Sequence, residues 1–171
     1  MRARRAWGCG AERHTGGAVN EPLAMLLAER RIGRQLTQLA RAMDERDWPA
    51  LDGIVAADAV ADFGTGPVAG RAAMVAVMRA FLDACGPTQH LLANLTVEVD
   101  GDAALSRCYV SDLHLGAGSR AHLSFQTLGE YRDRWQQQHG EWWLVQRIKV
   151  NRAHLGAFEV LGPGPPGWSR A

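Results

Sequence analysis

The sequence has no marked excess of charge of either sign. Its 171 residues include 19 basic and 18 acidic side chains, which gives a formal net charge of +1. A protein that is held to nucleic acid or to an anionic membrane surface by electrostatic attraction carries a clear positive excess. The composition therefore argues against both kinds of partner, and we expect neither nucleic acid nor a membrane to be bound.

Long apolar runs are also missing. A membrane-spanning helix needs roughly 20 consecutive apolar residues, and no stretch of the chain approaches that length. The N-terminal segment MRARRAWGCGAERHTGG is basic but lacks the apolar centre of a secretory signal. We therefore expect a cytoplasmic protein.

Cysteine and lysine are scarce. The three cysteines, Cys9, Cys85 and Cys108, are odd in number and far apart, and they form neither a CxxC pair nor a zinc-ligand spacing. They are expected to be reduced thiols. Lys149 is the only lysine. It shares one face of the last predicted strand with Arg147, and both are expected to face solvent or another subunit.

The chain has the length of one domain with a hydrophobic core. Residues 1–19 are rich in Arg and Gly without periodicity and are expected to form a disordered tail. The Pro/Gly-rich segment 161–171 is expected to form a second tail. The folded domain is therefore predicted to span residues 20–160.

The order of the predicted elements indicates an α+β fold. Apolar residues at helical spacing predict a helix over 21–47, a short one over 48–56 capped by Asp47, and a third over 71–85, with a short strand between the last two. A meander of four antiparallel strands follows; the predicted strands are 88–99, 103–115, 120–136 and 142–150. One strongly bent sheet against a helical layer would leave a pocket between them.

Strand register decides which side chains share that pocket. A three-residue loop at 100–102 would place His90 opposite Asp112 and Asn94 opposite Cys108, with His114 on the same face. The second hairpin, if centred on residues 117–118, would add Leu123, Phe125 and Thr127 to this face. His139 and His154 are expected in turns or tails. The predicted wall is mostly apolar with a few polar groups, which is typical of a small-molecule site.

Several segments resemble one known family. They are LARAMDERDWPAL, AVADFG, GRAAM, PTQHLL, DGDAALSRCYV, GEYRDRW and GEWWLV, and together they resemble the SnoaL-like branch of the nuclear transport factor 2-like superfamily. The resemblance covers residues 22–155 and is closest to the scytalone dehydratase branch. It implies an α+β cone-shaped barrel, in which a strongly curved antiparallel sheet and three N-terminal helices close a central pocket.

The resemblance also implies a set of site residues. The catalytic Asp of that branch falls on Asp44, its catalytic His on His90 and its second active-site His on His114, while its Ser falls near Thr127. Two tyrosines that hold a water against the substrate carbonyl are replaced here by Met43 and Phe63. This departure argues against the same substrate.

Together, the residues and the resemblance support a hypothesis of function. We expect a lyase or isomerase without cofactor or metal, acting on a hydrophobic cyclic or polyketide-like small molecule with an Asp44–His90 pair as the base and His114 protonating or positioning the leaving group. Asp112 is an alternative partner for His90. A polyketide cyclase and a non-catalytic binding or assembly protein remain alternatives. The residues predicted to bind substrate are Met43, Phe63, Leu92, Asn94, Val110, Asp112, Phe125 and Thr127.

Apolar side chains on the outer face of the predicted sheet indicate self-association. Leu95, Val97, Leu105 and Tyr109 share that face. The resemblance implies that it joins subunits, so a homodimer or homotrimer is expected.

Overall fold

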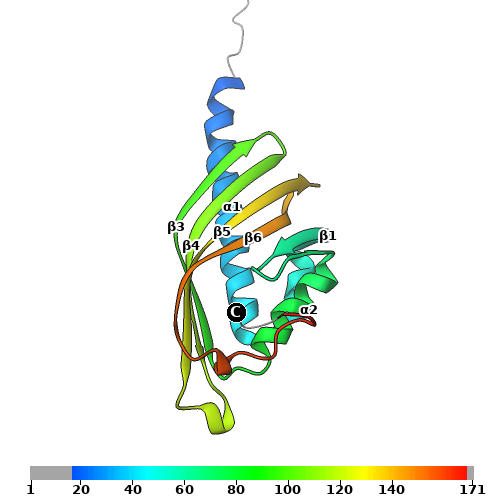
Figure 1. The fold of residues 1–171 in the computed structure, drawn as a ribbon. Helices are drawn as coiled ribbons and strands as arrows, with labels where there is room; N and C mark the ends of the chain where they lie inside the picture. The colour runs from blue at the N-terminus through cyan, green and yellow to red at the C-terminus, as the bar shows by residue number, and fades with distance from the viewer. Residues whose placement is uncertain (1–16, 169–171) are drawn as a thin grey trace, which may run out of the picture.

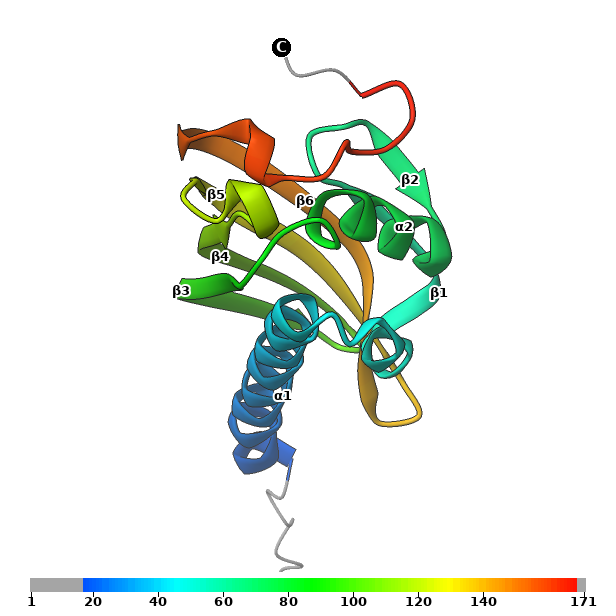
Figure 2. The same ribbon diagram turned by 90° about the horizontal axis from the view of Figure 1, so that it is seen from below.

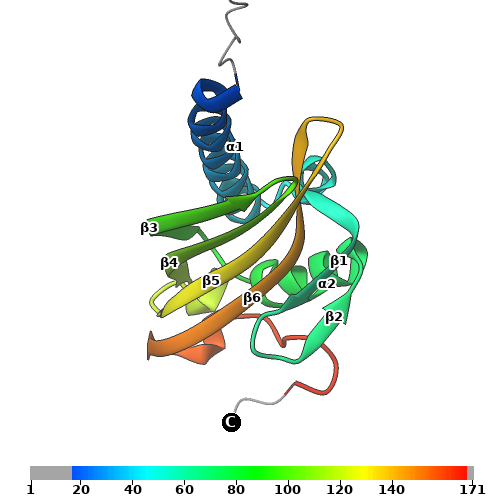
Figure 3. The same cartoon turned by 90° about the horizontal axis from the view of Figure 1, so that it is seen from above.

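A curved six-stranded sheet forms most of the protein, in a computed structural model that describes residues 17–168 (Figure 1). Its strand order is β2-β1-β6-β5-β4-β3, and only the β1–β6 pair is parallel. Figure 3 shows the long strands β3 to β6 lying side by side across the molecule. The strands are β1 (Val55–Asp62), β2 (Pro67–Ala69), β3 (Thr88–Asp100), β4 (Ala103–Leu115), β5 (Ser124–Gln138) and β6 (Glu141–Gly156). The predicted α+β fold with a curved, largely antiparallel sheet is confirmed.

Helix α1 (Gly17–Glu45) packs its apolar stripe against the sheet. Ile32, Leu36, Leu39 and Met43 recur every three or four residues and are all buried. The first turns extend past the sheet (Figure 1), and Leu26 is exposed there. None of the helices within residues 17–168 has the length and apolarity to cross a membrane.

The second predicted helix is shorter than expected. Residues Trp48–Gly53 form the 3-10 helix η1, whose Ala50 N–H donates to the capping Asp47 Oδ1 at 3.3 Å. Strand β1 then begins at Val55, inside the range predicted as helical. The β-branched pair Ile54-Val55 follows Gly53 directly, which favours extended backbone, and burial of both side chains holds it there.

Helix α2 (Arg71–Leu82) lies on the same side of the sheet as α1 (Figure 2). Its Met74, Val77, Met78 and Leu82 are buried toward the sheet. The helix ends three residues before the predicted limit at Cys85. Because α1 and α2 cover different parts of the curved sheet, space remains between them and the inner faces of β4 to β6.

A β-bulge changes the register along the first hairpin. Leu92 pairs with Val110 and His90 with Asp112, as predicted, but the register shifts between Ala93 and Thr96. The predicted three-residue loop at 100–102 is wrong, because Asp100 pairs with Ala103. At the bulge, Asn94 has a positive φ of 53°. The extra residue reverses which side chains point inward, so that β3 beyond the bulge turns valines rather than threonine toward the core. The predicted pairing of Asn94 with Cys108 is wrong for this reason.

The second hairpin has a longer loop than predicted. The short helix η2 (Gly118–Arg120) lengthens it, and Asp112 therefore pairs with Thr127 instead of Leu123. The shift amounts to four residues. Since side chains alternate with a period of two, an even shift leaves each residue on its predicted face. Phe125 and Thr127 consequently still face inward.

The two ends of the described chain differ from simple tails. Helix α1 begins at Gly17, and residues 1–16 of the segment expected to be a tail lie outside the described part. At the other end, the short helix η3 (Phe158–Val160) leads into a segment that packs on α2: the Gly162 N–H donates to Phe81 O at 2.7 Å. The rings of Phe81 and Trp168 meet edge to face, with centroids 5.0 Å apart.

Candidate active site

A cavity of about 450 Å³ lies between the inner faces of β4 to β6, helix α2 and the C-terminal segment. Its walls are mostly aromatic and apolar, with a cluster of polar groups on the strands. Such a combination suits a small apolar molecule that is oriented by a few polar contacts. The apolar lining includes Met43, Phe63, Val77, Met78, Phe81, Phe125, Phe158, Leu161 and Trp168.

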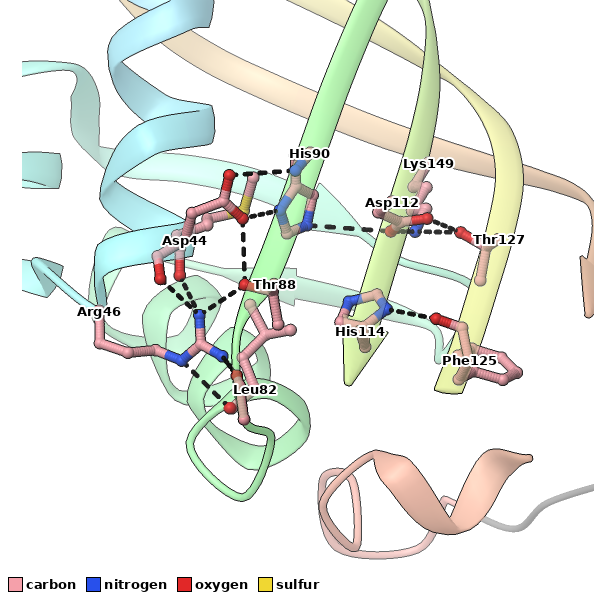
Figure 4. A network of polar contacts seen from close by, with 12 residues as sticks. Asp44, Arg46, Leu82, Thr88, His90, Asp112, His114, Phe125, Thr127 and Lys149 are labelled. Atoms are coloured by element: carbon pink, nitrogen blue, oxygen red, sulfur yellow. Dashed lines mark hydrogen bonds and ion pairs between the residues drawn. The ribbon is translucent and has the colours of Figure 1, made fainter. Parts of the chain in front are cut away.

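Asp44 and His90 meet at one wall of this cavity (Figure 4). His90 Nδ1 lies 2.6 Å from Asp44 Oδ1, and the His90 backbone N–H donates to Asp44 Oδ2 at 3.0 Å. The acceptor is a carboxylate, so the Nδ1 position carries the proton. His90 is therefore held as the tautomer whose Nε2 has a free lone pair.

Arg46 and Thr88 hold the Asp44 carboxylate in place. Thr88 Oγ1 donates to Asp44 Oδ1 at 3.0 Å and accepts from Arg46 Nη1 at 2.9 Å. Arg46 directly follows α1 with a φ of 60°, and its guanidinium also donates to the carbonyls of Met43 and Leu82. One arginine thus ties the end of α1 to α2 and to the start of β3, which fixes Asp44 relative to His90.

The hydrogen bonds keep Asp44 ionised. Burial alone would raise the pKa of its carboxyl group, but the hydrogen bonds from the His90 side chain and backbone and from Thr88 outweigh it and hold the pKa below its usual value. A carboxylate at this position can stabilise an imidazolium that forms on His90.

A second carboxylate lies on the other side of the His90 ring. Asp112 Oδ2 is 3.8 Å from His90 Nε2, too far for a hydrogen bond but close enough for electrostatic attraction. The sequence offers Asp112 as an alternative partner for His90. The structure gives the close contact to Asp44 and leaves Asp112 facing the nitrogen that carries the lone pair.

His114 completes the row of side chains but is held differently. Its Nδ1–H donates to the carbonyl of Phe125 at 3.3 Å, and its ring meets that of His90 edge to face. Burial lowers the pKa of His114 to about 4, although the nearby Asp112 acts in the opposite direction. His114 is therefore neutral at pH 7, and its Nε2 can accept a hydrogen bond but has no proton to give.

The low pKa of His114 predicts a loss of stability in mild acid. The unfolded chain binds a proton at an ordinary histidine pKa near 6.5, whereas the folded protein does so only near pH 4. Stability contributed by neutral His114 is thus present above about pH 6.5 and falls as the pH decreases toward 4. Between pH 7 and pH 4.5 we expect a loss of about 2 kcal/mol from this residue.

Urea unfolding at the two pH values measures this loss. His114→Asn keeps a side-chain N–H for the Phe125 carbonyl and does not titrate, so its stability should change by about 2 kcal/mol less than that of the wild type. Asp44 and Asp112, whose pKa values are lowered, lose part of their contribution to stability as the pH falls, but they are present in both proteins, so their effect cancels in the comparison. An equal acid loss in the variant would contradict the assignment.

Asp112 is bound from its far side by two residues. Lys149 Nζ lies 2.5 Å from Asp112 Oδ2 and also donates to Thr127 Oγ1 at 3.0 Å, while the Thr127 hydroxyl donates to Asp112 Oδ1. Burial would raise the pKa of Asp112, but Lys149 and Thr127 hold it below its usual value. The prediction that Lys149 faces solvent or another subunit is wrong, because its side chain reaches inward across β5 to this buried carboxylate.

The site also contains a set of groups that metals accept. One ligand atom each from His90, Asp112 and His114 lies within 4.8 Å of the others. Asp44 is not part of this set, and its Oδ1 is engaged by His90 Nδ1. Lys149 places a fixed positive charge on Asp112, which opposes a second cation there. Function without a metal or cofactor stays a prediction.

The structure divides the residues predicted to bind substrate. Met43, Phe63, Asp112, Phe125 and Thr127 line the cavity. Three others do not. Asn94 is exposed at the bulge, where its positive φ turns the side chain away from the inner face. Leu92 and Val110 point inward but pack with Cys108 and Tyr131 in the core beside the cavity.

Several cavity residues were not predicted. Lys149 and Tyr131 line the cavity, and Arg46 holds Asp44 through Thr88. The prediction that His154 lies in a turn or tail is wrong, because it is on β6 and lines the cavity. A basic residue just after a helix often donates hydrogen bonds to the last carbonyls of that helix. This pattern in the sequence could have identified Arg46 as a residue that caps α1. The alternation of β6 placed Lys149 and Arg147 together correctly but does not say which face is inner when both faces carry polar residues.

Solved structures share this architecture. A type 2 hexachlorocyclohexane dehydrochlorinase matches with a TM-score of 0.72 and 19% identity over 86% of this chain and 100% of that chain. The type 3 enzyme from Novosphingobium barchaimii LL02 gives 0.71 and 17% over 85% and 100%. A protein described provisionally as a scytalone dehydratase, from Novosphingobium aromaticivorans, gives 0.68 and 19% over 85% and 97%. At these identities the matches show a shared fold.

Comparison with sequences gives the family. No curated protein matches the chain. The family model of the SnoaL-like domain matches residues 24–148, which include most of α1, all of α2 and most of the sheet together with Asp44, His90, Asp112 and His114. The match covers well over half of the chain, and the curved sheet and its cavity have the form that the sequence resemblance implied. The protein therefore belongs to the SnoaL-like domain family.

Proposed function

We propose that the protein is a cofactor-independent lyase or isomerase that acts by general acid–base catalysis on an apolar cyclic small molecule. The observation that carries the proposal is the 2.6 Å contact of His90 Nδ1 with Asp44 at the wall of an apolar cavity. It fixes a histidine lone pair beside the space where a substrate fits. Both β-elimination and double-bond isomerisation begin with removal of a proton from carbon, which suits such a base.

The two carboxylates support this step electrostatically. When His90 Nε2 accepts a proton, the imidazolium has Asp44 on one nitrogen and Asp112 near the other, at 2.6 and 3.8 Å. The His90 side chain is only 3% exposed, so water screens these attractions little. A positioned base of this kind contributes about 10²–10⁴-fold to the rate.

The state of His114 limits how the proton moves afterwards. Neutral His114 donates its only N–H to the Phe125 carbonyl, so it has no proton for a leaving group. This revises the expected role of His114 as an acid. In our proposal His90 itself returns the proton, either to a leaving group on the same face of the substrate or to another carbon of it, and His114 orients a substrate hydroxyl by accepting its hydrogen bond.

The cavity lining supports an apolar, ring-containing substrate. Phe63, Phe81, Phe125 and Trp168 offer flat surfaces to a cyclic or polyketide-like molecule. A volume of about 450 Å³ lies in the range of small-molecule sites. The contact between His90 and Asp44 also favours catalysis over mere binding, since an apolar ligand gains nothing from an oriented base.

A panel of cyclic β-hydroxy ketones and cyclic alkyl chlorides in D₂O tests the proposal. We expect the protein to catalyse loss of water or HCl, or deuterium uptake at carbon, in at least one class without added metal or cofactor. Asp44→Asn should lower kcat about 10–10³-fold, because the amide cannot stabilise the imidazolium. NMR follows both reactions. Asp58→Asn, on the exposed surface of β1, is the matched control. Equal rates in the Asp44 and Asp58 variants, or ligand binding without turnover in every class, would overturn the proposal.

A further inference from the structure

Lys149 has an unusual place for a lysine. Its side chain is 11% exposed and lies on the inner face of β6, where it lines the cavity (Figure 4). The residue pairs with Tyr131 across the β5–β6 ladder, yet its ammonium reaches Thr127, four residues further along β5. Gly129 lies between these two on the inner face and has no side chain to obstruct the lysine.

The ammonium group has one N–H more than its protein partners use. It carries three N–H groups. Among residues 17–168, its hydrogen bonds go to Asp112 Oδ2 at 2.5 Å and Thr127 Oγ1 at 3.0 Å. The third N–H is therefore available to a molecule in the cavity. Both acceptors are buried, so the ammonium is held in one position by the fold.

The base and the ammonium flank the same oxygen atom. Asp112 Oδ2 is 3.8 Å from His90 Nε2 and 2.5 Å from Lys149 Nζ. A single substrate fragment of a few atoms can therefore contact both nitrogens. In a carbonyl compound the acidic C–H and the carbonyl oxygen are on adjacent carbon atoms, which matches a base and a cation placed side by side.

We propose that Lys149 is a catalytic residue that binds the carbonyl oxygen of the substrate, and that the substrate class is a cyclic or aromatic ketone with an acidic hydrogen on the carbon next to the carbonyl. This inference rests on the proposed function of the same site. His90 Nε2 takes that hydrogen as a proton, the C–H electron pair forms the new C=C bond, and the C=O π pair moves to oxygen. The enolate oxygen is held by the third Lys149 N–H.

The charges of the site suit a neutral ketone. Asp112 and Lys149 form a neutral ion pair, and Thr88 links the Asp44 carboxylate to the Arg46 guanidinium, so each carboxylate that flanks His90 has a basic group nearby. When the proton moves, a negative oxygen and a positive imidazolium appear together. The negative oxygen lies against Lys149, and the imidazolium lies between the carboxylates of Asp44 and Asp112. Because these groups are fixed before the reaction, they stabilise the enolate state more than the ketone.

The phenol 4-nitrophenol is a probe of this arrangement, because its phenolate resembles an enolate and absorbs visible light. At a pH below the phenol's own pKa, we expect the wild type to bind it as the phenolate, with its proton on His90. The double variant Asp112→Asn/Lys149→Met should bind it as the neutral phenol. The double variant leaves no unpaired charge in the site, and replacing both members of a buried ion pair is often tolerated. Thermal unfolding verifies that the variant is folded. Absence of phenolate absorbance in the wild type, or its persistence in the double variant, would overturn the inference.

Deuterium exchange of cyclic ketones separates this inference from the proposed function. We expect the double variant to lower kcat for exchange next to the carbonyl about 10²–10³-fold with a smaller change in KM. If His90→Gln abolishes exchange and the double variant retains it, Lys149 has no catalytic role while the base assignment stands. If exchange survives in His90→Gln, the proposed function itself fails.

Discussion

Replacing His90 by glutamine is expected to lower kcat about 10²–10⁴-fold for any reaction that begins with proton removal from carbon. The glutamine amide can still donate to Asp44 Oδ1, and the backbone N–H at this position still donates to Oδ2, so the contact between α1 and β3 survives. What is lost is the lone pair that faces the cavity. Initial rates with the most active ketone or β-hydroxy ketone of the panel measure the effect.

His122→Gln is the matched control, since His122 is exposed and lies outside the cavity. Its kcat should equal that of the wild type. The double variant Asp44→Asn/His90→Gln should be no slower than His90→Gln alone, because the carboxylate acts only through the imidazole. Additive losses would show that Asp44 acts on the substrate independently, and a His90 variant with full activity would remove the proposed base.

The sequence predicted correctly that His90 on β3 and Asp112 on β4 share the inner face of the sheet. His90 at the head of the strand and Asp112 on β4 lie opposite each other, but the predicted three-residue loop at 100–102 is wrong, and the pairing holds because the bulge offsets the shorter loop. The longer second hairpin did no harm, because an even shift preserves the faces and left Thr127 beside Asp112. Strand faces are thus predicted more robustly than loops are.

The bulge in β3 could not be predicted by counting residues from the hairpin loop. A single extra residue at Asn94, with its positive φ, reverses the faces for the rest of β3. The bulge turns Val97 and Val99 toward the core. Strict alternation from His90 predicts that Thr96 faces the core instead. Counting apolar residues on both faces of 95–100 would have favoured a bulge, but no local sequence signal fixed its position.

Charged residues on β6 show a different limit. The sequence predicts that Arg147 and Lys149 share a face of β6 that is directed to solvent or another subunit, and this is wrong for both. Arg147 has a buried carboxylate on the neighbouring strand β5, Asp133, and Lys149 has one two strands away on β4, Asp112. Which carboxylate lies near each basic side chain depends on the register of β4, β5 and β6 together. The alternation of residues within one strand does not determine that register. The apolar Met43 and Phe63 in the cavity left the group that binds a carbonyl unidentified, and Lys149 now fills that role in our proposal.

Asp133→Asn is expected to destabilise the folded protein by about 3–5 kcal/mol, the largest effect on stability that the structure predicts. Arg147 Nε and Nη2 donate to the two Asp133 oxygens at 2.8 and 2.7 Å, and both side chains are 1% exposed. The guanidinium also stacks on the Tyr131 ring at 4.0 Å. Removing the carboxylate leaves a buried positive charge with no counterion in contact, and urea unfolding at pH 7 measures the cost.

The double variant Asp133→Leu/Arg147→Met separates the ion pair from the packing. It removes both charges and keeps apolar volume, so we expect it to be within about 1–2 kcal/mol of the wild type and more stable than Asp133→Asn. Arg107→Met, at an exposed arginine that contacts Glu130 on the outer face, should cost less than about 1 kcal/mol. Equal destabilisation by Asp133→Asn and by the double variant would mean that the pair matters through its shape rather than its charge. In that case the position of Tyr131, which lines the cavity, would depend on the packing of its neighbours and not on the ion pair.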